Sequence, residues 1–201
     1  MATEAPNRIR MRPEDRREQL LDVAVSVFGS QPYDEVTMAA IAERAGVSKG
    51  LVFNYFPGKR ELYREVLRVA AVRAELASDP DPALPAPQRF RGGLEVFVTA
   101  VAGAPHLLRA YGAGADPEAR ALIAATYESI AGRMIDRMGV AATPRLRHAV
   151  LAWLEFVRTT TVAWIAEEAV TREQLIELQI ATFRAAAETA LGPDAARAAL
   201  P

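Results

Sequence analysis

Residues 37–59 read TMAAIAERAGVSKGLVFNYFPGK, and this stretch predicts two short helices joined by a tight turn. In a helix that begins after Thr37, whose hydroxyl can cap backbone N–H groups, one face is apolar. That face holds Met38, Ile41, Ala42 and Ala45. Gly46 supplies the left-handed backbone that commonly ends a helix, and Ser48 is placed to cap the next one. Because neither helix can bury its apolar side alone, we expect a helix-turn-helix packed against longer neighbours.

A longer helix is predicted on each side of this stretch. The first begins near Pro13, because proline is favoured in the first helical turn, and Glu14 and Asp15 suit its positive end. Its apolar stripe holds Leu20, Leu21, Ala24, Val27 and Phe28. The second begins at Lys59 and continues to about residue 76. We therefore predict an N-terminal three-helix domain at residues 1–60, followed by a helix that connects it to the rest of the chain.

The second short helix carries an unusual set of outward side chains. A rotation of about 100° per residue sorts its residues into two sides. The inward residues are Val52, Phe56 and, at the margin, Phe53. The outward residues are Gly50, Leu51, Asn54 and Tyr55, with Lys49 in the first turn. An ordinary solvated face does not combine leucine, asparagine and tyrosine in this way, so this side is a candidate binding surface.

The outward side suits the major groove of DNA, which admits one helix. Lys49 and Asn54 can form hydrogen bonds with base edges, Leu51 can contact a thymine methyl group, and Gly50 lets the backbone approach closely. Tyr55 can reach a phosphate. Lys59 begins the next helix, where its ammonium group and the helix N-terminus together favour another phosphate.

Residues 17–67 resemble the tetracycline-repressor (TetR) family of transcriptional regulators. The resemblance rests on Phe28 at the end of the first helix and on three motifs: T-x-x-x-I-A at 37–42, A-G-V-S-x-G at 45–50, and Y-F-x-x-K-x-x-L at 55–62. It implies base or near-base contacts from Ser48, Lys49, Gly50, Leu51 and Asn54. It implies phosphate contacts from Thr37, Tyr55 and Lys59. Leu51 and Phe53 depart from the family pattern, which commonly has a small hydroxyl residue and a tyrosine there.

Beyond a proline-rich segment at residues 78–87, every segment is apolar at helical spacing, so the fold class is all-α. The predicted helices are 87–102, 105–111, 117–138, 144–168 and 171–191. We expect residues 61–201 to form a helical effector-binding and dimerisation domain. The last two helices are apolar on more than one face, and the resemblance implies a four-helix bundle with a second copy. The alternative is that both faces are buried within one subunit.

A ligand pocket is expected among the aromatic and mildly polar residues of the central helices. The candidates are Phe97, His106, Tyr111, Tyr127, Trp153, Phe156, Thr160 and Trp164. Such residues build pockets in helical bundles, but at helical spacing they also form plain core. His106 and the threonines at 159–161 are the expected polar groups. Arg109 and Arg158 leave an acidic or acyl-type effector open.

The composition excludes several classes of protein. Hydrophobic residues make up 51% and charged residues 24% of the chain, which is typical of a soluble globular protein. There is no cysteine and there are two histidines, so we expect no disulfide and no metal site. No nucleotide-binding fingerprint or catalytic constellation is present, so we expect no cofactor and no enzymatic activity. The absence of a signal-like segment or of about 18 uncharged apolar residues in a row favours the cytoplasm rather than a membrane.

The sequence thus predicts a homodimeric regulator that binds double-stranded DNA at a palindromic operator. We expect a repressor that is released by a small apolar or amphipathic effector. A helical protein–protein interaction module or ligand sensor without operator binding is the alternative. Arg8, Arg10 and Arg12 form a short basic arm, which is either a solvated tail or a further DNA contact.

Overall fold

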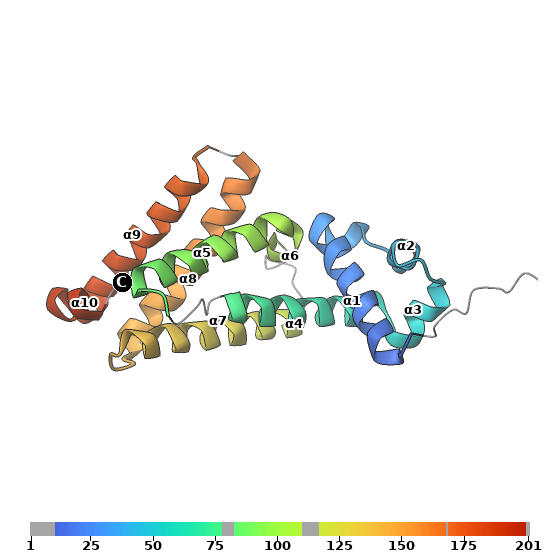
Figure 1. Cartoon of the computed structure of the whole chain (residues 1–201), viewed down its shortest axis with the longest axis horizontal. Helices are drawn as coiled ribbons and strands as arrows, with labels where there is room; N and C mark the ends of the chain where they lie inside the picture. Colours follow the sequence, from blue (N-terminus) through green and yellow to red (C-terminus); the bar gives the residue numbers. More distant parts are fainter. Residues whose placement is uncertain (1–10, 78–82, 110–116, 168, 200–201) are drawn as a thin grey trace, which may run out of the picture.

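The computed structural model describes residues 11–77, 83–109, 117–167 and 169–199, and these residues form helices and short connections with no strand. A small head at one end is joined to a larger helical body by one long helix (Figure 1). The head holds α1 (Pro13–Ser30), the 3-10 turn η1 (Tyr33–Glu35), α2 (Met38–Arg44) and α3 (Lys49–Tyr55). The long helix is α4 (Lys59–Ala77). The body holds α5 (Ala86–Gly103), α6 (Pro105–Arg109), α7 (Pro117–Met138), α8 (Pro144–Glu167), α9 (Arg172–Leu191) and α10 (Pro193–Ala199).

The all-α prediction is confirmed, and the predicted helices match the observed ones closely. One helix was not predicted, since residues 193–199 form α10, which begins at Pro193 with Asp194 in its first turn. Proline and an acidic residue at that position are a helix-start signal, but the segment is short and follows Gly192. The helix forms because it packs against α9 and buries Ala196.

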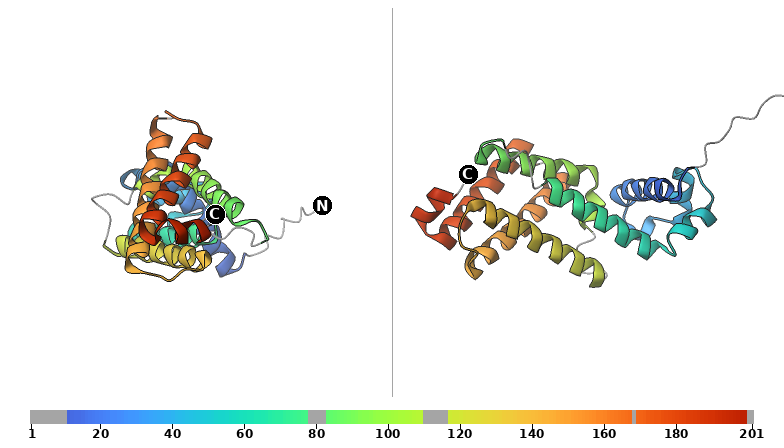
Figure 2. Two further views of the ribbon diagram at one scale, coloured as in Figure 1. Left: turned by 90° about the vertical axis from the view of Figure 1, so that its left-hand side faces the viewer. Right: turned by 60° about the horizontal axis from the view of Figure 1, so that its bottom comes forward.

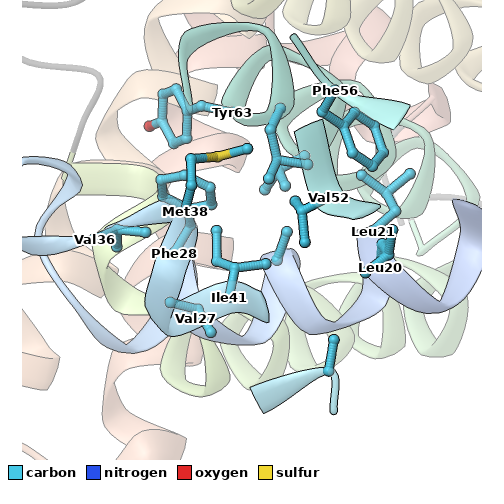
Figure 3. Close-up of a cluster of buried hydrophobic side chains, with 14 of the residues drawn as sticks. Leu20, Leu21, Val27, Phe28, Val36, Met38, Ile41, Val52, Phe56 and Tyr63 are labelled. Carbon is cyan, nitrogen blue, oxygen red and sulfur yellow. The ribbon is translucent and has the colours of Figure 1, made fainter. Parts of the chain in front are cut away.

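The core of the head is built from all three helices of the predicted domain and from α4, and Leu107 of α6 and Ala119 of α7 join it. Figure 3 shows the side chains of α1, α2 and α3 meeting around Ile41. Leu20, Ile41 and Val52 are fully buried. Leu62 and Val66, on the first half of α4, belong to the same cluster. The connecting helix is therefore part of the head as well as its link to the body.

The body has a second core between α5, α7, α8 and α9. Its centre is aromatic, because the rings of Phe90, Trp153 and Phe183 lie 4.7–5.5 Å apart between centroids. The indole N–H of Trp153 donates to the carbonyl oxygen of Gln179 at 2.8 Å. The apolar sides of α5, α8 and α9 thus meet around one cluster of rings, in which Phe90 and Trp153 are stacked.

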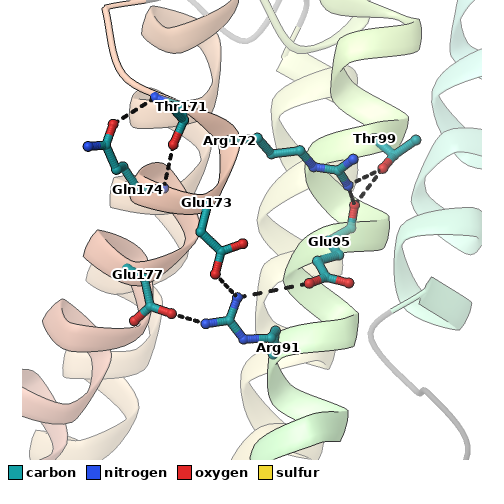
Figure 4. A network of polar contacts seen from close by, with 8 residues as sticks. All are labelled: Arg91, Glu95, Thr99, Thr171, Arg172, Glu173, Gln174 and Glu177. Carbon is teal, nitrogen blue, oxygen red and sulfur yellow. Dashed lines mark hydrogen bonds and ion pairs between the residues drawn. The ribbon is translucent and has the colours of Figure 1, made fainter.

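A polar network on the surface fastens α5 to α9 (Figure 4). Arg91 forms ion pairs with Glu173 at 3.1 Å and with Glu177. Arg172 donates to the carbonyl oxygen of Glu95 at 2.7 Å. The start of α9 is set by Thr171, which exchanges hydrogen bonds with Gln174 in a capping box.

Helix α8 has the length and mean apolar composition to cross a membrane, but Glu155 and Arg158 interrupt it, so it contains no run of about 18 uncharged apolar residues. Within the described residues it is the one helix with these properties. Its residues Leu146, Val150 and Trp153 are buried in the core of the body. Since the buried side of a core helix has the same composition, this packing accounts for the apolar residues on that side of α8.

Ion pairs hold α4 on both sides. The pairs to α1 are Arg17 with Glu65 at 2.8 Å and Arg73 with Asp22 at 2.9 Å. The pairs to α7 are Arg64 with Glu118 at 2.8 Å and Arg133 with Glu75 at 3.4 Å. Figure 2 shows α4 running from the head into the body. The position of the head relative to the body therefore depends on this helix and on the packing of α6 against α1.

The ion pair between Arg17 and Glu65 predicts a pH-dependent contribution to stability. The hydrogen bond from Arg17 holds the pKa of the Glu65 carboxyl below its ordinary value, against the opposing effect of partial burial. A lowered folded-state pKa stabilises the protein above the unfolded pKa of about 4.3, and this contribution is lost as pH falls through the folded pKa. We expect Glu65→Gln to lower the free energy of unfolding at pH 7 by less than about 1 kcal/mol, because the pair is partly exposed.

Urea denaturation at pH 7 and pH 3 tests this expectation. The difference between Glu65→Gln and the native chain should be smaller at pH 3 than at pH 7. In an Arg17→Gln background most of the pH 7 effect should already be gone. A difference of equal size at both pH values would mean that the carboxylate charge is not its source.

Candidate functional site

The turn between α2 and α3 is closed by backbone hydrogen bonds around Gly46. Gly46 has φ of 67°, and its N–H donates to the carbonyl oxygen of Glu43 at 3.0 Å. The next N–H, of Val47, donates to the carbonyl oxygen of Ala42 at 3.0 Å. This pair of bonds is the Schellman motif, which needs a left-handed residue at the helix end. The predicted helix stop is confirmed, and it sets the angle at which α3 leaves α2.

Both short helices start with a hydroxyl cap, as the sequence predicted. The Thr37 hydroxyl oxygen accepts from the N–H of Ala40 at 3.0 Å, and the Ser48 hydroxyl oxygen accepts from the N–H of Leu51 at 3.2 Å. Each hydroxyl keeps its own O–H as a donor, and both residues are exposed. Thr37 and Ser48 can therefore cap a helix and contact an acceptor on a partner at the same time.

The exposed side of α3 differs in one respect from the predicted one. Lys49, Gly50 and Asn54 are exposed, as expected. Phe53, which we placed at the inward margin, is 40% exposed, and the ammonium group of Lys49 lies 5.7 Å from its ring centroid. Tyr55, which we placed outward, is half-buried and packs against the core of the head. We call the exposed residues Lys49, Gly50, Phe53 and Asn54 the α3 face.

The reason for this difference lies at the end of the helix. Phe56 leaves the helix with φ of −135° and ψ of 109°, so its buried ring does not follow the helical rotation. If Phe56 is counted as a helical residue, the centre of the buried side of α3 is placed too close to Phe53. In the structure the inward direction is centred on Val52, about 100° from Phe53 and about 60° from Tyr55. Leu51 is half-buried at the edge of the α3 face.

Lys59 is already engaged within the head. Its ammonium group donates to the carbonyl oxygen of Asp34 at 3.3 Å and lies 4.3 Å from the ring centroid of Tyr33. This contact joins the start of α4 to the 3-10 turn before α2. An ammonium group has three N–H donors, so one bond to a carbonyl leaves donors for a phosphate.

The body contains a cavity of about 150 Å³ between α4, α5, α7, α8, α9 and α10. Three of the predicted ligand-contacting residues line it: Phe97, Tyr127 and Trp153. Ala74 of α4 also lines it, so the cavity reaches the helix that carries the head. The lining is apolar apart from Tyr127, Arg89 and Arg137.

The other predicted ligand-contacting residues do not line this cavity. Thr160 donates to the carbonyl oxygen of Phe156 at 2.8 Å and accepts from the amide of Gln179 at 3.1 Å. Trp164 donates to the carbonyl oxygen of Val170 at 2.8 Å, at the turn between α8 and α9. Phe156 packs on the core at another side of α8, and His106 is half-buried in α6. Tyr111 and the side chain of Arg109 lie outside the described part of the chain.

Sequence reasoning missed the arginines of the cavity. It considered Arg109 and Arg158, but Arg158 forms an ion pair with Glu155 at 2.9 Å. The cavity is lined by Arg89 and Arg137. The spacing of Phe90, Leu94 and Phe97 on α5 would have indicated one shared face, but nothing in it shows that Arg89 borders a cavity. Among the described residues, no group of His, Asp or Glu side chains is arranged to hold a metal ion.

Comparisons with known proteins point to one family. Residues 20–66 match the model of the tetR family of bacterial regulatory proteins. The HTH-type transcriptional activator FasR of Mycolicibacterium smegmatis is 38% identical over 94 residues, which cover 44% of this chain and 41% of FasR. The HTH-type transcriptional repressor KstR2 of the same organism is 32% identical over 68 residues, which cover 34% of this chain and 31% of KstR2. The chain thus spans less than half the length of these relatives.

A solved structure extends the similarity to the body. A tetR-family transcriptional regulator from Streptomyces coelicolor superimposes with a TM-score of 0.82 over 94% of this chain and 88% of the other, at 24% identity. At this identity the agreement shows that the fold is shared. The head is therefore similar in sequence and structure to known regulators, and the body is similar in structure.

Replacement by alanine should have opposite effects on stability at Gly46 of the Schellman turn and at a glycine inside a helix. No atom lies within 4 Å of the position that a Cβ would take at Gly46 or at Gly132, which lies inside α7. Gly46→Ala should lower the free energy of unfolding by about 1–2 kcal/mol, because an L-residue is strained at positive φ. Gly132→Ala should raise it by about 0.5–1 kcal/mol, because alanine favours a helix interior. Urea denaturation measures both. Equal effects of the two variants would contradict the assignment.

Proposed function

The chain belongs to the tetR family of bacterial regulatory proteins, and we propose that it is a transcriptional regulator that binds an operator in double-stranded DNA through the α3 face. The carrying observation is the exposure of Lys49, Gly50, Phe53 and Asn54 on a helix whose opposite side is buried at Val52. A helix with one buried side and an exposed Lys and Asn can enter the major groove. We assign residues 1–60 to the DNA-binding domain and residues 61–201 to the effector-binding and dimerisation domain.

We assign contacts with DNA bases to residues of the α3 face and its border, and contacts with DNA phosphates to residues around the face. Lys49 and Asn54 can bond base edges, Gly50 permits close approach, and Ser48 and Leu51 lie at the border of the face. Thr37, Tyr55 and Lys59 are the proposed phosphate contacts. The cap hydroxyl of Thr37 and the remaining donors of Lys59 support this assignment.

The chain is proposed to act as a homodimer through α8 and α9. Leu175, Ile180 and Phe183 are buried within the subunit, so one side of α9 is already occupied. On the other side Leu178 is 51% exposed, and Ala181 and Ala185 are exposed at helical spacing from it. An apolar strip of this kind suits the same strip of a second copy. Two heads on a palindromic operator discriminate sequences better than one.

The proposed regulation is release from DNA by a small apolar or amphipathic molecule, which makes the chain a repressor. The cavity supports this because Ala74 of α4 is part of its wall. A ligand there favours one position of α4, and the ion pairs between α4 and α1 carry that position to the head. The effect is limited by the difference in ligand affinity between the two conformations. The chain has no proposed catalytic role, metal or cofactor.

The DNA assignment predicts different outcomes for the two lysines. Lys49→Ala should weaken binding to the selected operator by about 1–3 kcal/mol and weaken binding to random duplex much less, because it removes a base contact. Lys59→Ala should weaken both by a similar factor and reduce the slope of log affinity against log salt by about 1. Fluorescence anisotropy with both duplexes at several salt concentrations measures these effects. If Lys49→Ala weakens both duplexes equally, its assignment to base contact is wrong.

A close contact between α1 of the head and Ala104 of the body predicts that a substitution on one side affects DNA binding and that a second substitution compensates for it. A Cβ at Gly29, near the end of α1, would lie 2.8 Å from the Cβ of Ala104, which lies just before α6. Gly29→Ala must therefore push α1 away from the body. We expect weaker operator binding by this variant, with the helix content unchanged.

Ala104→Gly removes the opposing methyl group, so the double variant Gly29→Ala with Ala104→Gly should recover operator affinity. Anisotropy titrations of the single and double variants test this. A single variant with native affinity would show that this contact does not position the head.

A further inference from the structure

We propose that Phe53 recognises the C5-methyl group of a thymine, so that the α3 face is specific for thymine at one position of each operator half-site. Thymine is the base whose edge carries a methyl group in the major groove of DNA. This inference rests on the proposed operator binding, and it identifies the base that one side chain of the α3 face recognises.

Phe53 projects from the middle of the α3 face. With about 100° of rotation per residue, Lys49 and Asn54 mark the two edges of this face, about 140° apart. Phe53 and Gly50 lie between them, each about 30° from the centre, and the buried Val52 is about 130° from it. Because Gly50 has no side chain, the ring of Phe53 is the group that a partner meets first at the centre of the face.

The surroundings of this ring leave it available to a partner. Phe53 is 40% exposed and does not belong to the core cluster of the head that holds Phe56. Helical side chains lean toward the N-terminus of their helix, which brings the ring over the turn that contains Gly50. That side is open, because apart from the helix backbone and the adjacent residues the nearest atom to a Cβ at Gly50 would be the Ser48 hydroxyl oxygen, at 4.0 Å. The ammonium group of Lys49, 5.7 Å from the ring centroid, lies on the same part of the face.

The chemistry of a phenyl ring determines which group of the DNA it can recognise. The ring has no N–H or O–H donor, so it offers no hydrogen bond to a phosphate or to the acceptors of a base edge. The apolar group in the major groove is the C5-methyl of thymine, and a phenylalanine side chain can contact it. This contact removes apolar surface of both groups from water. Phe53 therefore favours thymine over the other three bases.

Leu51 is the alternative residue for contact with a methyl group, and the structure places it less well. Leu51 is half-buried, and its direction is about 130° from the centre of the α3 face. Phe53 is about 30° from the centre. When this face enters the groove, a base methyl group therefore meets Phe53 before it meets Leu51.

Fluorescence anisotropy of the full chain tests the proposal with the duplex that the chain selects from a random pool. In a series of duplexes, each thymine is replaced in turn by deoxyuridine in both half-sites, which removes only the C5-methyl group. We expect one position at which this replacement weakens binding about 15-fold, which is about fourfold for each of two buried methyl groups. Phe53→Ala, with native helix content by circular dichroism, should bind the two duplexes of that position equally. Leu51→Ala should keep the native ratio between them.

The proposal is overturned if no thymine of the selected duplex shows this dependence, or if Phe53→Ala keeps it, because the two changes must then act independently. Loss of the dependence in Leu51→Ala and its retention in Phe53→Ala would assign the methyl contact to Leu51. Failure to select any sequence from the pool would contradict the proposed operator binding itself. A selected operator whose binding does not depend on a thymine methyl group would overturn the role of Phe53 alone.

Discussion

The structure depends on one constraint, which is that α4 is packed into two parts of the molecule at once. Leu62 and Val66 on its first half are fully buried in the core of the head. Ala74 on its second half lines the cavity of the body. Ion pairs to α1 on one side and to α7 on the other keep the helix from shifting independently of either part. A change in the body that moves α4 must therefore move the head, and in the proposed regulation this helix, together with the packing of α6 against α1, connects the cavity to the DNA-binding head.

The same packing determines what the head presents to a partner. Helix α3 has only seven residues, and Val52 is its buried residue. One buried side chain, a Schellman turn before the helix and the extended Phe56 after it fix its rotation. The residues that remain exposed are then decided by rotation and not by polarity, which is why Phe53 is on the outside beside Lys49. The proposed binding surface is therefore a consequence of how the head buries its core.

The head could be predicted from the sequence because its signals are local. Thr37, Gly46 and Ser48 are stop and start residues whose roles depend on neighbours a few positions away, and all three act as predicted. The rotation of α3 was misjudged at Phe53 and Tyr55, because the helix ends before Phe56. The cavity was predicted in part, since Phe97, Tyr127 and Trp153 line it. Arg89 and Arg137 were missed because their approach depends on how α5 and α7 pack, and spacing within one helix does not show that.

The measurement that tests the central claim most directly is sequencing of the DNA fragments that the purified full chain selects from a random duplex pool. The account predicts enrichment of a two-fold symmetric sequence whose half-sites are centred about 10 base pairs, or a multiple of one helical turn, apart. This spacing is what two α3 faces on a symmetric dimer require. Selection of no sequence above the random pool would contradict the claim that the α3 face reads an operator.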